Sequence, residues 1–283
     1  MRIKAPFVDL NNHLDSLERE TQLLYNETVT IVEIQGSRAL IIAEEQQRFY
    51  KDEGFSGYKG WVDTNALSSY DSDVKKEVIV ISKRAPVTLE ETGDTIPLPF
   101  GCSFTCLGEE EHFLHIETAD GKAGKIHRND VVRRGETSPS PNITELSRIF
   151  LGDPYLWGGR TPFCKKDAVG TSGIDCSGLT SILYRILGVD IPRNACDQYR
   201  IAKEKPGNRL QSGDLLFSAP ITNPGKIDHV MLYVGDEKII EARKSTGSVG
   251  EIGCEERFGC HLSDLESGDE TGDLVLYFGS IPF

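Results

Sequence analysis

Short stretches in which apolar and polar residues alternate dominate the first half of the chain and predict β-strands. The predicted strands are residues 28–34, 39–43, 57–62, 77–81, 85–89, 113–116 and 121–126. A pair of glycines spaced as Gly-x-x-Gly recurs at Gly57 and at Gly121, where we expect tight turns. The repeat predicts two similar units, residues 1–72 and 73–133, each the size of a small β-barrel.

The pattern changes after residues 134–142, whose two prolines and small polar residues are typical of a linker. A helix is predicted from 143 to 151, and another from 176 to 187, where apolar residues recur at i, i+3, i+4, i+7 and i+8 before Gly188. Strands are then predicted at residues 214–217, 229–234, 238–242 and 274–278. Helices followed by an antiparallel sheet indicate an α+β domain over residues 143–283.

Cys176 stands on the first turn of the second predicted helix. The positive end of the helix dipole and the unpaired N–H groups at this position favour the thiolate, which is the nucleophilic form of cysteine. Taken alone, Cys176 is equally open to interpretation as a small buried residue, as most cysteines are. A reactive thiolate here would predict covalent catalysis on a carbonyl group.

His229 begins a predicted strand, and Glu241 lies on the next strand of a hairpin that turns at Gly235-Asp236. The two positions are an even number of residues apart, so their side chains are expected on the same face. A carboxylate beside His229 would fix its tautomer and leave the other ring nitrogen for Cys176. The alternative is a cross-strand ion pair on a solvated face.

Five short segments within residues 143–283 carry a recognisable combination of motifs. They are Tyr155-Leu156-Trp157-Gly158-Gly159, Asp175-Cys176-Ser177-Gly178-Leu179, Pro192-Arg193 with Gln198, Ser212-Gly213-Asp214-Leu215, and His229-Val230 through Ile240-Glu241-Ala242. In this order they resemble the NlpC/P60 family of cysteine peptidases. The two N-terminal units resemble bacterial SH3-type barrels. The resemblance implies a papain-like catalytic domain preceded by two SH3-like β-barrels, as in the γ-D-glutamyl-L-diamino acid endopeptidases.

The resemblance also implies catalytic roles. Cys176 would be the nucleophile, His229 the general base and Glu241 the third polar residue. The family most often has a second histidine at that third position, so Glu241 is a departure, although a carboxylate also orients an imidazole. Tyr155 would stand beside the nucleophile and join the Cys176 N–H in an oxyanion hole. Its alternative role is that of a core aromatic residue.

Several residues are implied at the substrate-binding end of the site. Asp175 and Ser177 match positions that hold the free amino terminus of the substrate in the relatives, but Asp175 is equally placed to cap the helix. Arg193 belongs to a family motif, and Asn194 stands where the relatives often carry aspartate. Residues 160–173 are expected to form a loop at the rim, with its lysines facing solvent.

Composition narrows the range of partners. The net charge of −13 disfavours nucleic acids, membranes and anionic wall polymers, so a small diffusible substrate fits better. Seven scattered cysteines without metal-ligand spacing predict free thiols in a reducing compartment, with no metal and no cofactor. No stretch approaches the roughly 18 apolar residues of a membrane span. The N-terminus lacks the apolar core of a secretory signal, so a cytoplasmic location is expected if Met1 is the native start.

Together these observations predict a monomeric enzyme with a small peptide substrate. It would be a cysteine endopeptidase that hydrolyses the γ-D-Glu–diaminopimelate bond of short peptidoglycan stem peptides with a free N-terminal L-Ala, in muropeptide recycling or remodelling. Two alternatives remain at this point. One is a related papain-like amidase or acyl transferase that acts on another amide. The other is a catalytically silent cell-wall-binding protein whose barrels carry the function.

Overall fold

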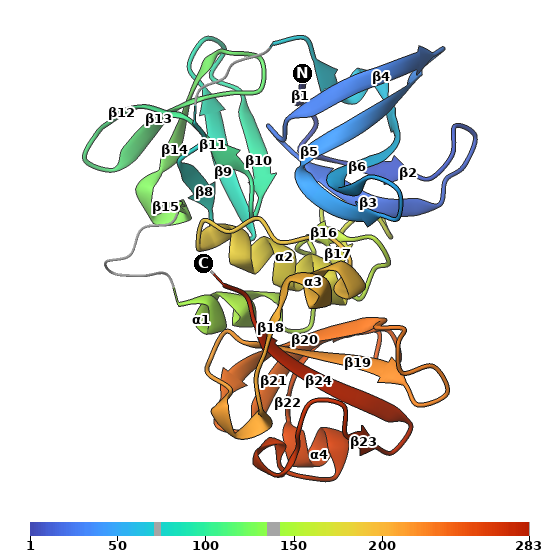
Figure 1. Cartoon of the computed structure of the whole chain (residues 1–283). Helices are drawn as coiled ribbons and strands as arrows, with labels where there is room; N and C mark the ends of the chain where they lie inside the picture. Colours follow the sequence, from blue (N-terminus) through green and yellow to red (C-terminus); the bar gives the residue numbers. More distant parts are fainter. Residues whose placement is uncertain (71–74, 135–141, 283) are drawn as a thin grey trace.

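The computed structural model describes residues 1–70, 75–134 and 142–282 of the chain. Two β units stand side by side at the N-terminal end, helices lie beneath them, and a C-terminal sheet forms the far side (Figure 1). The predicted boundary between residues 72 and 73 lies outside the described residues, as do all but the two ends of the predicted linker 134–142. Among the residues that the structure describes, no helix has the length and apolar character needed to cross a membrane.

The first β unit is built on a five-stranded antiparallel sheet with the strand order β3-β2-β6-β5-β4, and β1 pairs with β7 beside it. Its strands are β1 (Arg2–Ile3), β2 (Phe7–Asn11), β3 (Arg19–Leu24), β4 (Val29–Gln35), β5 (Arg38–Tyr50), β6 (Gly54–Asp63) and β7 (Leu67–Ser68). Alternate residues of these strands, among them Leu10, Leu23, Ile41 and Val62, point inward and form a separate small core. Ile41 and Val62 belong to strands that the sequence predicted, whereas β2 and β3, which carry Leu10 and Leu23, were not predicted.

The prediction of a tight turn at Gly57 was wrong, because Gly57 and Gly60 lie inside β6. A Cβ atom at Gly60 would stand 2.7 Å from the carbonyl oxygen of Asn11, and one at Gly57 would stand 2.8 Å from that of Ala43. These glycines allow neighbouring strands to approach closely. Gly121 does lie in a turn, with φ of +75°.

The second β unit contains a three-stranded sheet, β11-β8-β15, and a five-stranded sheet, β10-β9-β14-β13-β12. Its strands are β8 (Val78–Val80), β9 (Arg84–Leu89), β10 (Thr95–Pro99), β11 (Ser103–Phe104), β12 (Cys106–Glu109), β13 (Phe113–Glu117), β14 (Ala123–His127) and β15 (Val131–Arg133). Both N-terminal units are thus rich in antiparallel strands. Their assignment as SH3-like barrels stays a prediction.

The remaining residues form helices followed by a mainly antiparallel sheet, which is the predicted α+β arrangement. The sheet has the order β18-β24-β19-β20-β21-β22, with β23 paired to β24. The elements are α1 (Ile143–Ser147), β16 (Arg160–Thr161), β17 (Gly173–Ile174), α2 (Cys176–Ile186), α3 (Ala195–Ile201), β18 (Lys203–Glu204), β19 (Leu215–Pro220), β20 (His229–Gly235), β21 (Lys238–Arg243), β22 (Ser248–Gly253), α4 (Cys254–Phe258), β23 (Glu270–Thr271) and β24 (Leu274–Ser280).

Helix α2 lies at the centre of the molecule, between the N-terminal units and the C-terminal sheet (Figure 1). All eleven of its residues are buried, so it is covered on every side rather than on the single apolar face that the sequence predicted. The second β unit packs so closely on it that a Cβ atom at Gly101 would stand 2.5 Å from the side chain of Ile182. The second unit, α2 and one face of the sheet therefore share one hydrophobic core.

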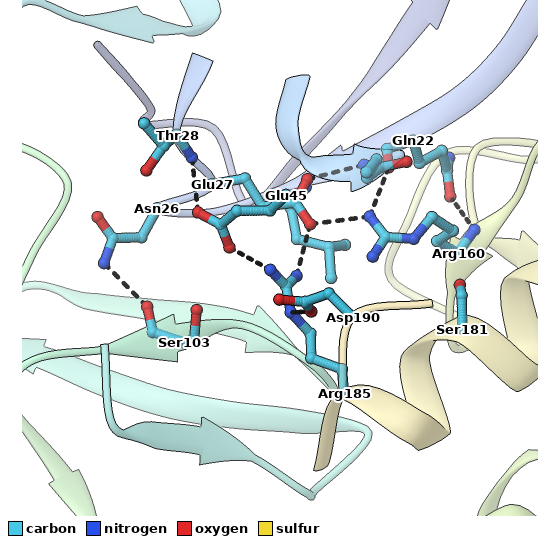
Figure 2. A network of polar contacts seen from close by, with 12 residues as sticks. Gln22, Asn26, Glu27, Thr28, Glu45, Ser103, Arg160, Ser181, Arg185 and Asp190 are labelled. Atoms are coloured by element: carbon cyan, nitrogen blue, oxygen red, sulfur yellow. Dashed lines mark hydrogen bonds and ion pairs between the residues drawn. The ribbon is translucent and has the colours of Figure 1, made fainter. Parts of the chain in front are cut away.

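Buried charges join α2 to the first β unit (Figure 2). Nη1 of Arg185 lies 2.6 Å from Oε1 of Glu27, and Nη1 of Arg160 lies 2.9 Å from the same oxygen. Arg185 also pairs with Glu45, which in turn pairs with Lys76 at the start of the second unit. Burial alone would raise the pKa of Glu27, but the two guanidinium groups outweigh it and lower that pKa. These ion pairs fix the orientation of the first unit relative to α2.

The expectation of a rim loop from residue 160 was wrong at its beginning. Arg160 opens β16, which pairs with β17, and the residue is only 2% exposed. A charged residue at this depth requires an ionic partner, and Glu27 supplies it from the first β unit. Lys165 and Lys166, farther along the segment, are exposed as expected.

Candidate active site

Cys176 is the first residue of α2, as the sequence predicted. The helix begins there because Asp175 caps it, its Oδ1 accepting a hydrogen bond of 2.7 Å from the N–H of Gly178. The residue is 8% exposed and lines a cavity of about 720 Å³. Its thiol is thus held at the positive end of a buried helix and is open to a small molecule.

His229 and Glu241 extend from β20 and β21 toward each other. Nε2 of His229 lies 2.6 Å from Oε2 of Glu241, which confirms the predicted shared face of the hairpin. Oε1 of Glu241 accepts a second bond, of 2.9 Å, from Nε of Arg257 in α4. Cys176 also lies close enough to the same imidazole to raise its pKa. Since Glu241 occupies Nε2, Nδ1 is the ring nitrogen left for Cys176.

The charge state of His229 follows from these neighbours. Burial alone would lower its pKa, but the interactions with Cys176 and Glu241 outweigh burial and raise the pKa to about 10. Burial likewise tends to raise the pKa of Glu241, yet His229 and Arg257 shift it below the usual value. At neutral pH the geometry therefore favours an imidazolium held between a carboxylate and the cysteine sulfur.

Arg193 is 2% exposed and connects the residues on both sides of Cys176. It holds Asp175 through two bonds, of 3.0 Å to Oδ1 and 2.8 Å to Oδ2, and donates to Oγ of Ser177 at 2.9 Å. Its Nε reaches Thr21 in the first β unit at 2.7 Å. The backbone N–H groups of Gly158 and Gly178 also donate hydrogen bonds to Oδ2 and Oδ1 of Asp175, so both of its oxygens accept bonds within the protein.

The other predicted residues also reach the cavity. Asp175, Ser177, Arg193 and Asn194 line it together with Cys176 and His229, and Tyr155 lines it beside them. Burial, followed by the charges of Cys176 and Asp175, raises the pKa of Tyr155, so its hydroxyl is a proton-bearing donor. The residues that the sequence motifs predicted for the site therefore lie around one cavity in the fold.

Three residues of the first β unit line the same cavity and were not predicted: Glu20, Arg48 and Tyr58. The hydroxyl of Tyr58 donates to Oε2 of Glu20 at 2.7 Å, and Nη1 of Arg48 lies 3.3 Å from the same oxygen. They come from β3, β5 and β6, so only the packing of the first unit on the helices brings them to Cys176. No local motif in the sequence signals that contact.

Comparison with known proteins gives related chains that span most of this one. A γ-D-glutamyl-L-lysine dipeptidyl-peptidase from Bacillus subtilis is 30% identical over 231 residues, covering 81% of this chain and 74% of that protein. A protein of the same name from Bacillus cereus is 26% identical over 241 residues, covering 81% and 69%. The model of the NlpC/P60 family matches residues 152–258. The chain belongs to the NlpC/P60 family.

A solved structure of an NlpC/P60 family protein from Bacillus cereus shares the fold over the whole length. It superposes with a TM-score of 0.81 at 22% identity and covers 99% of both chains. The papain-like NlpC/P60 fold of the C-terminal part is therefore confirmed. NlpC/P60 peptidases are cysteine peptidases, and the relatives named above support a cell-wall peptidase activity for this chain.

Proposed function

We propose that the protein is a cysteine endopeptidase that hydrolyses the bond between γ-D-Glu and a diamino acid in short peptidoglycan peptides. The observation that carries this proposal is the contact of His229 with Cys176 on one side and with Glu241 on the other, at the wall of a cavity. Two similar proteins are named for the bond to L-lysine. The diaminopimelate bond predicted from the sequence belongs to the same chemical class.

In the first half of the reaction the Cys176 thiolate attacks the γ-carbonyl carbon of the substrate. An S–C bond forms, and the C–N bond breaks as His229 donates its Nδ1 proton to the leaving amine. The pKa of about 10 keeps that proton on His229 at neutral pH, where it is needed. The products of this step are a thioester on Cys176 and a free diamino acid.

In the second half water hydrolyses the thioester. The neutral imidazole of His229 takes a proton from the water as its oxygen bonds to the acyl carbon, and the S–C bond breaks. The dipeptide leaves as its γ-carboxylic acid and releases the second proton of the water to solvent as it ionises to the carboxylate, while Cys176 and His229 return to their starting ion pair. Glu241 keeps the imidazole in one orientation and stabilises its charged form in both halves.

Tyr155 and the N–H of Cys176 would stabilise the oxyanion. The hydroxyl of Tyr155 has no hydrogen-bond partner within residues 1–70, 75–134 and 142–282, and it lines the cavity next to the nucleophile. A donor that is fixed in place and unoccupied suits a charge that develops only during the reaction.

The free amino terminus of the substrate would bind at the first β unit. Asp175 was predicted to hold it, but both oxygens of Asp175 already accept bonds within the protein. Glu20 offers a carboxylate whose Oε1 has no partner in the described part of the chain, whereas its Oε2 is held by Tyr58. We therefore assign the amine contact to Glu20, with Asp175 and Ser177 shaping the floor beside it.

The first β unit forms one wall of the cavity through Glu20, Arg48 and Tyr58. We propose that a free muropeptide is the substrate rather than an intact wall strand, in agreement with the acidic net charge of −13 and with the amine contact assigned to Glu20. The identity of the two N-terminal units as SH3-like barrels belongs to the same proposal, supported by their size and strand content.

The test compares L-Ala-γ-D-Glu-L-Lys with its N-acetylated form, using the wild type, Glu20→Gln and the exposed control Glu18→Gln. We expect the wild type to release lysine rapidly from the peptide with a free amino terminus and not from the N-acetylated peptide. In Glu20→Gln the ratio of the two rates should fall about 10- to 100-fold, the range for one charge-assisted hydrogen bond. Glu18→Gln should keep the preference. Equal cleavage of both peptides by the wild type would contradict the proposed substrate class.

A further inference from the structure

Three cations line the cavity and have no acidic partner among the residues that the structure describes. They are Lys226, Arg243 and Lys244, and they share the cavity with Cys176 and His229. Within the described ranges 1–70, 75–134 and 142–282, none of the three side chains forms an ion pair or a hydrogen bond. The cavity therefore contains positive charge that the protein itself does not neutralise.

The other cations of the cavity are occupied. Arg48 pairs with Glu20, Arg193 with Asp175, and Arg257 with Glu241. Asp228, which precedes His229 in the chain, lines the cavity and forms no salt bridge with any of the described residues. Unpaired charge in the cavity thus favours anions, although the protein as a whole carries a net charge of −13.

The three cations come from the segments that flank His229. Arg243 follows Glu241 by two residues on β21, so its side chain leaves the strand on the same face as Glu241. Lys244 is the next residue, and Lys226 lies in the segment just before β20, which begins at His229. The three cations therefore come from the same segments as the proton donor His229, whereas Glu20 and Tyr58 come from the first β unit.

This side receives the leaving group in the proposed function, on which the inference rests. His229 must lie next to the leaving nitrogen in order to protonate it. In a diamino acid the carbon atom bonded to that nitrogen also carries the α-carboxylate. When the diamino acid is the last residue of the peptide, this carboxylate is free and charged. It lies two bonds from the leaving nitrogen that His229 protonates.

We propose that Arg243 and Lys244, assisted by Lys226, bind a carboxylate of the leaving diamino acid and so determine specificity on that side of the scissile bond. The ligand chemistry is a carboxylate beside the leaving amine. The α-carboxylate of a C-terminal residue is one source, and the distal carboxylate of diaminopimelate, which lysine lacks, is the other. A peptide with lysine as the diamino acid would be a poor substrate if the α-carboxyl group of that lysine were a neutral amide, because it would then offer neither carboxylate.

The experiment measures kcat/KM for three peptides that share L-Ala-γ-D-Glu. The third residue is L-Lys with a free carboxylate, L-Lys carboxamide, or meso-diaminopimelate with its α-carboxyl group as the carboxamide. The enzymes are the wild type, Arg243→Gln, Lys244→Gln and the double variant. Lys166→Gln is the matched control, because Lys166 is exposed and lies outside the cavity. The backbone carbonyl of Arg243 accepts a hydrogen bond from the hydroxyl of Thr246 in the following turn. Replacing the side chain of Arg243 does not remove this bond.

If the α-carboxylate is bound, the wild type should prefer free lysine peptide over its carboxamide by about 10- to 100-fold, the range for one charge-assisted contact. If the distal carboxylate is bound, kcat/KM for the diaminopimelate carboxamide peptide should exceed kcat/KM for the lysine carboxamide peptide by a similar factor. In either case the double variant should lose the preference, while Lys166→Gln keeps it. Circular dichroism and Tm establish that each variant is folded.

Other outcomes separate the two proposals. Equal cleavage of all three peptides by the wild type would overturn the carboxylate site and leave the peptidase intact. A preference that survives in the double variant, or that Lys166→Gln loses to the same extent, would also overturn it. No cleavage of any peptide by folded, reduced wild type would contradict the proposed function itself.

Discussion

Oε2 of Glu241 lies 2.6 Å from Nε2 of His229 in the hairpin of β20 and β21. The distance is that of a strong, charge-assisted hydrogen bond. The other oxygen of Glu241 is held by Arg257, so the carboxylate is fixed from both sides. We therefore expect Glu241 to orient the imidazole, the role that the family resemblance assigns to a second histidine, and to add a negative charge beside it.

That charge predicts how Glu241→Gln alters catalysis. The amide retains the shape but removes the carboxylate that raises the pKa of His229, so the alkaline fall in activity should move from about pH 10 to lower pH. We expect kcat/KM at neutral pH to fall about 10- to 100-fold, as for other residues that orient a reacting group. The measurement is a pH profile, with the exposed Glu256→Gln as control. An unchanged alkaline limb would contradict the role of Glu241.

The raised pKa of His229 also makes stability depend on pH. The native pKa of about 10 lies above the ordinary 6.5, so the folded protein holds a proton that the unfolded chain releases between these values. The contribution is fully present below pH 6.5 and is lost as the pH rises through about 10. The decrease in Tm from pH 6.5 to 10 should therefore be steeper for the wild type than for His229→Gln. Parallel curves would rule out the raised pKa.

The buried ion pairs beneath the first β unit predict a large loss of stability in Glu27→Gln. The substitution leaves Arg160 and Arg185 without the shared carboxylate at a depth that water does not reach. Removing one partner of such a buried network costs about 3–5 kcal/mol. Urea unfolding at pH 7 measures the effect, with the exposed Glu44→Gln as the matched control. Equal unfolding midpoints for the two variants would contradict a stabilising network.

Tyr155→Phe separates the two roles that the sequence left open. The hydroxyl has no partner among the described side chains and backbone, so its removal should leave Tm nearly unchanged. If it stabilises the oxyanion, kcat should fall about 100-fold while KM changes little. Steady-state kinetics on L-Ala-γ-D-Glu-L-Lys decide between the roles. Full activity in Tyr155→Phe would identify Tyr155 as a packing residue alone.

Local patterns predicted the parts of the site that lie within one or two neighbouring elements. Alternation in the hairpin placed His229 and Glu241 on one face, and the cap at Asp175 placed Cys176 at the start of α2. Such relationships depend on strand and helix geometry, which the sequence expresses directly.

Contacts between distant segments were not predictable in this way. Glu20 and Tyr58 reach the cavity only because the first β unit packs on the helices. Arg185 lies outside the apolar positions that predicted this helix, and its burial is possible because Glu27 from the first unit pairs with it. Gly57 and Gly60 predicted a tight turn in the sequence, whereas in the structure the missing side chain of Gly60 allows a close contact between strands. Each of these depends on tertiary packing rather than on a local preference.

The proposed activity is tested most directly by mass-spectrometric analysis of L-Ala-γ-D-Glu-meso-diaminopimelate incubated with reduced protein, with Cys176→Ala in parallel. We expect release of L-Ala-D-Glu and free diaminopimelate by the wild type and none by Cys176→Ala, whose fold should be retained. An intact tripeptide after incubation with folded wild type, or equal release by Cys176→Ala, would contradict a cysteine peptidase acting at this bond.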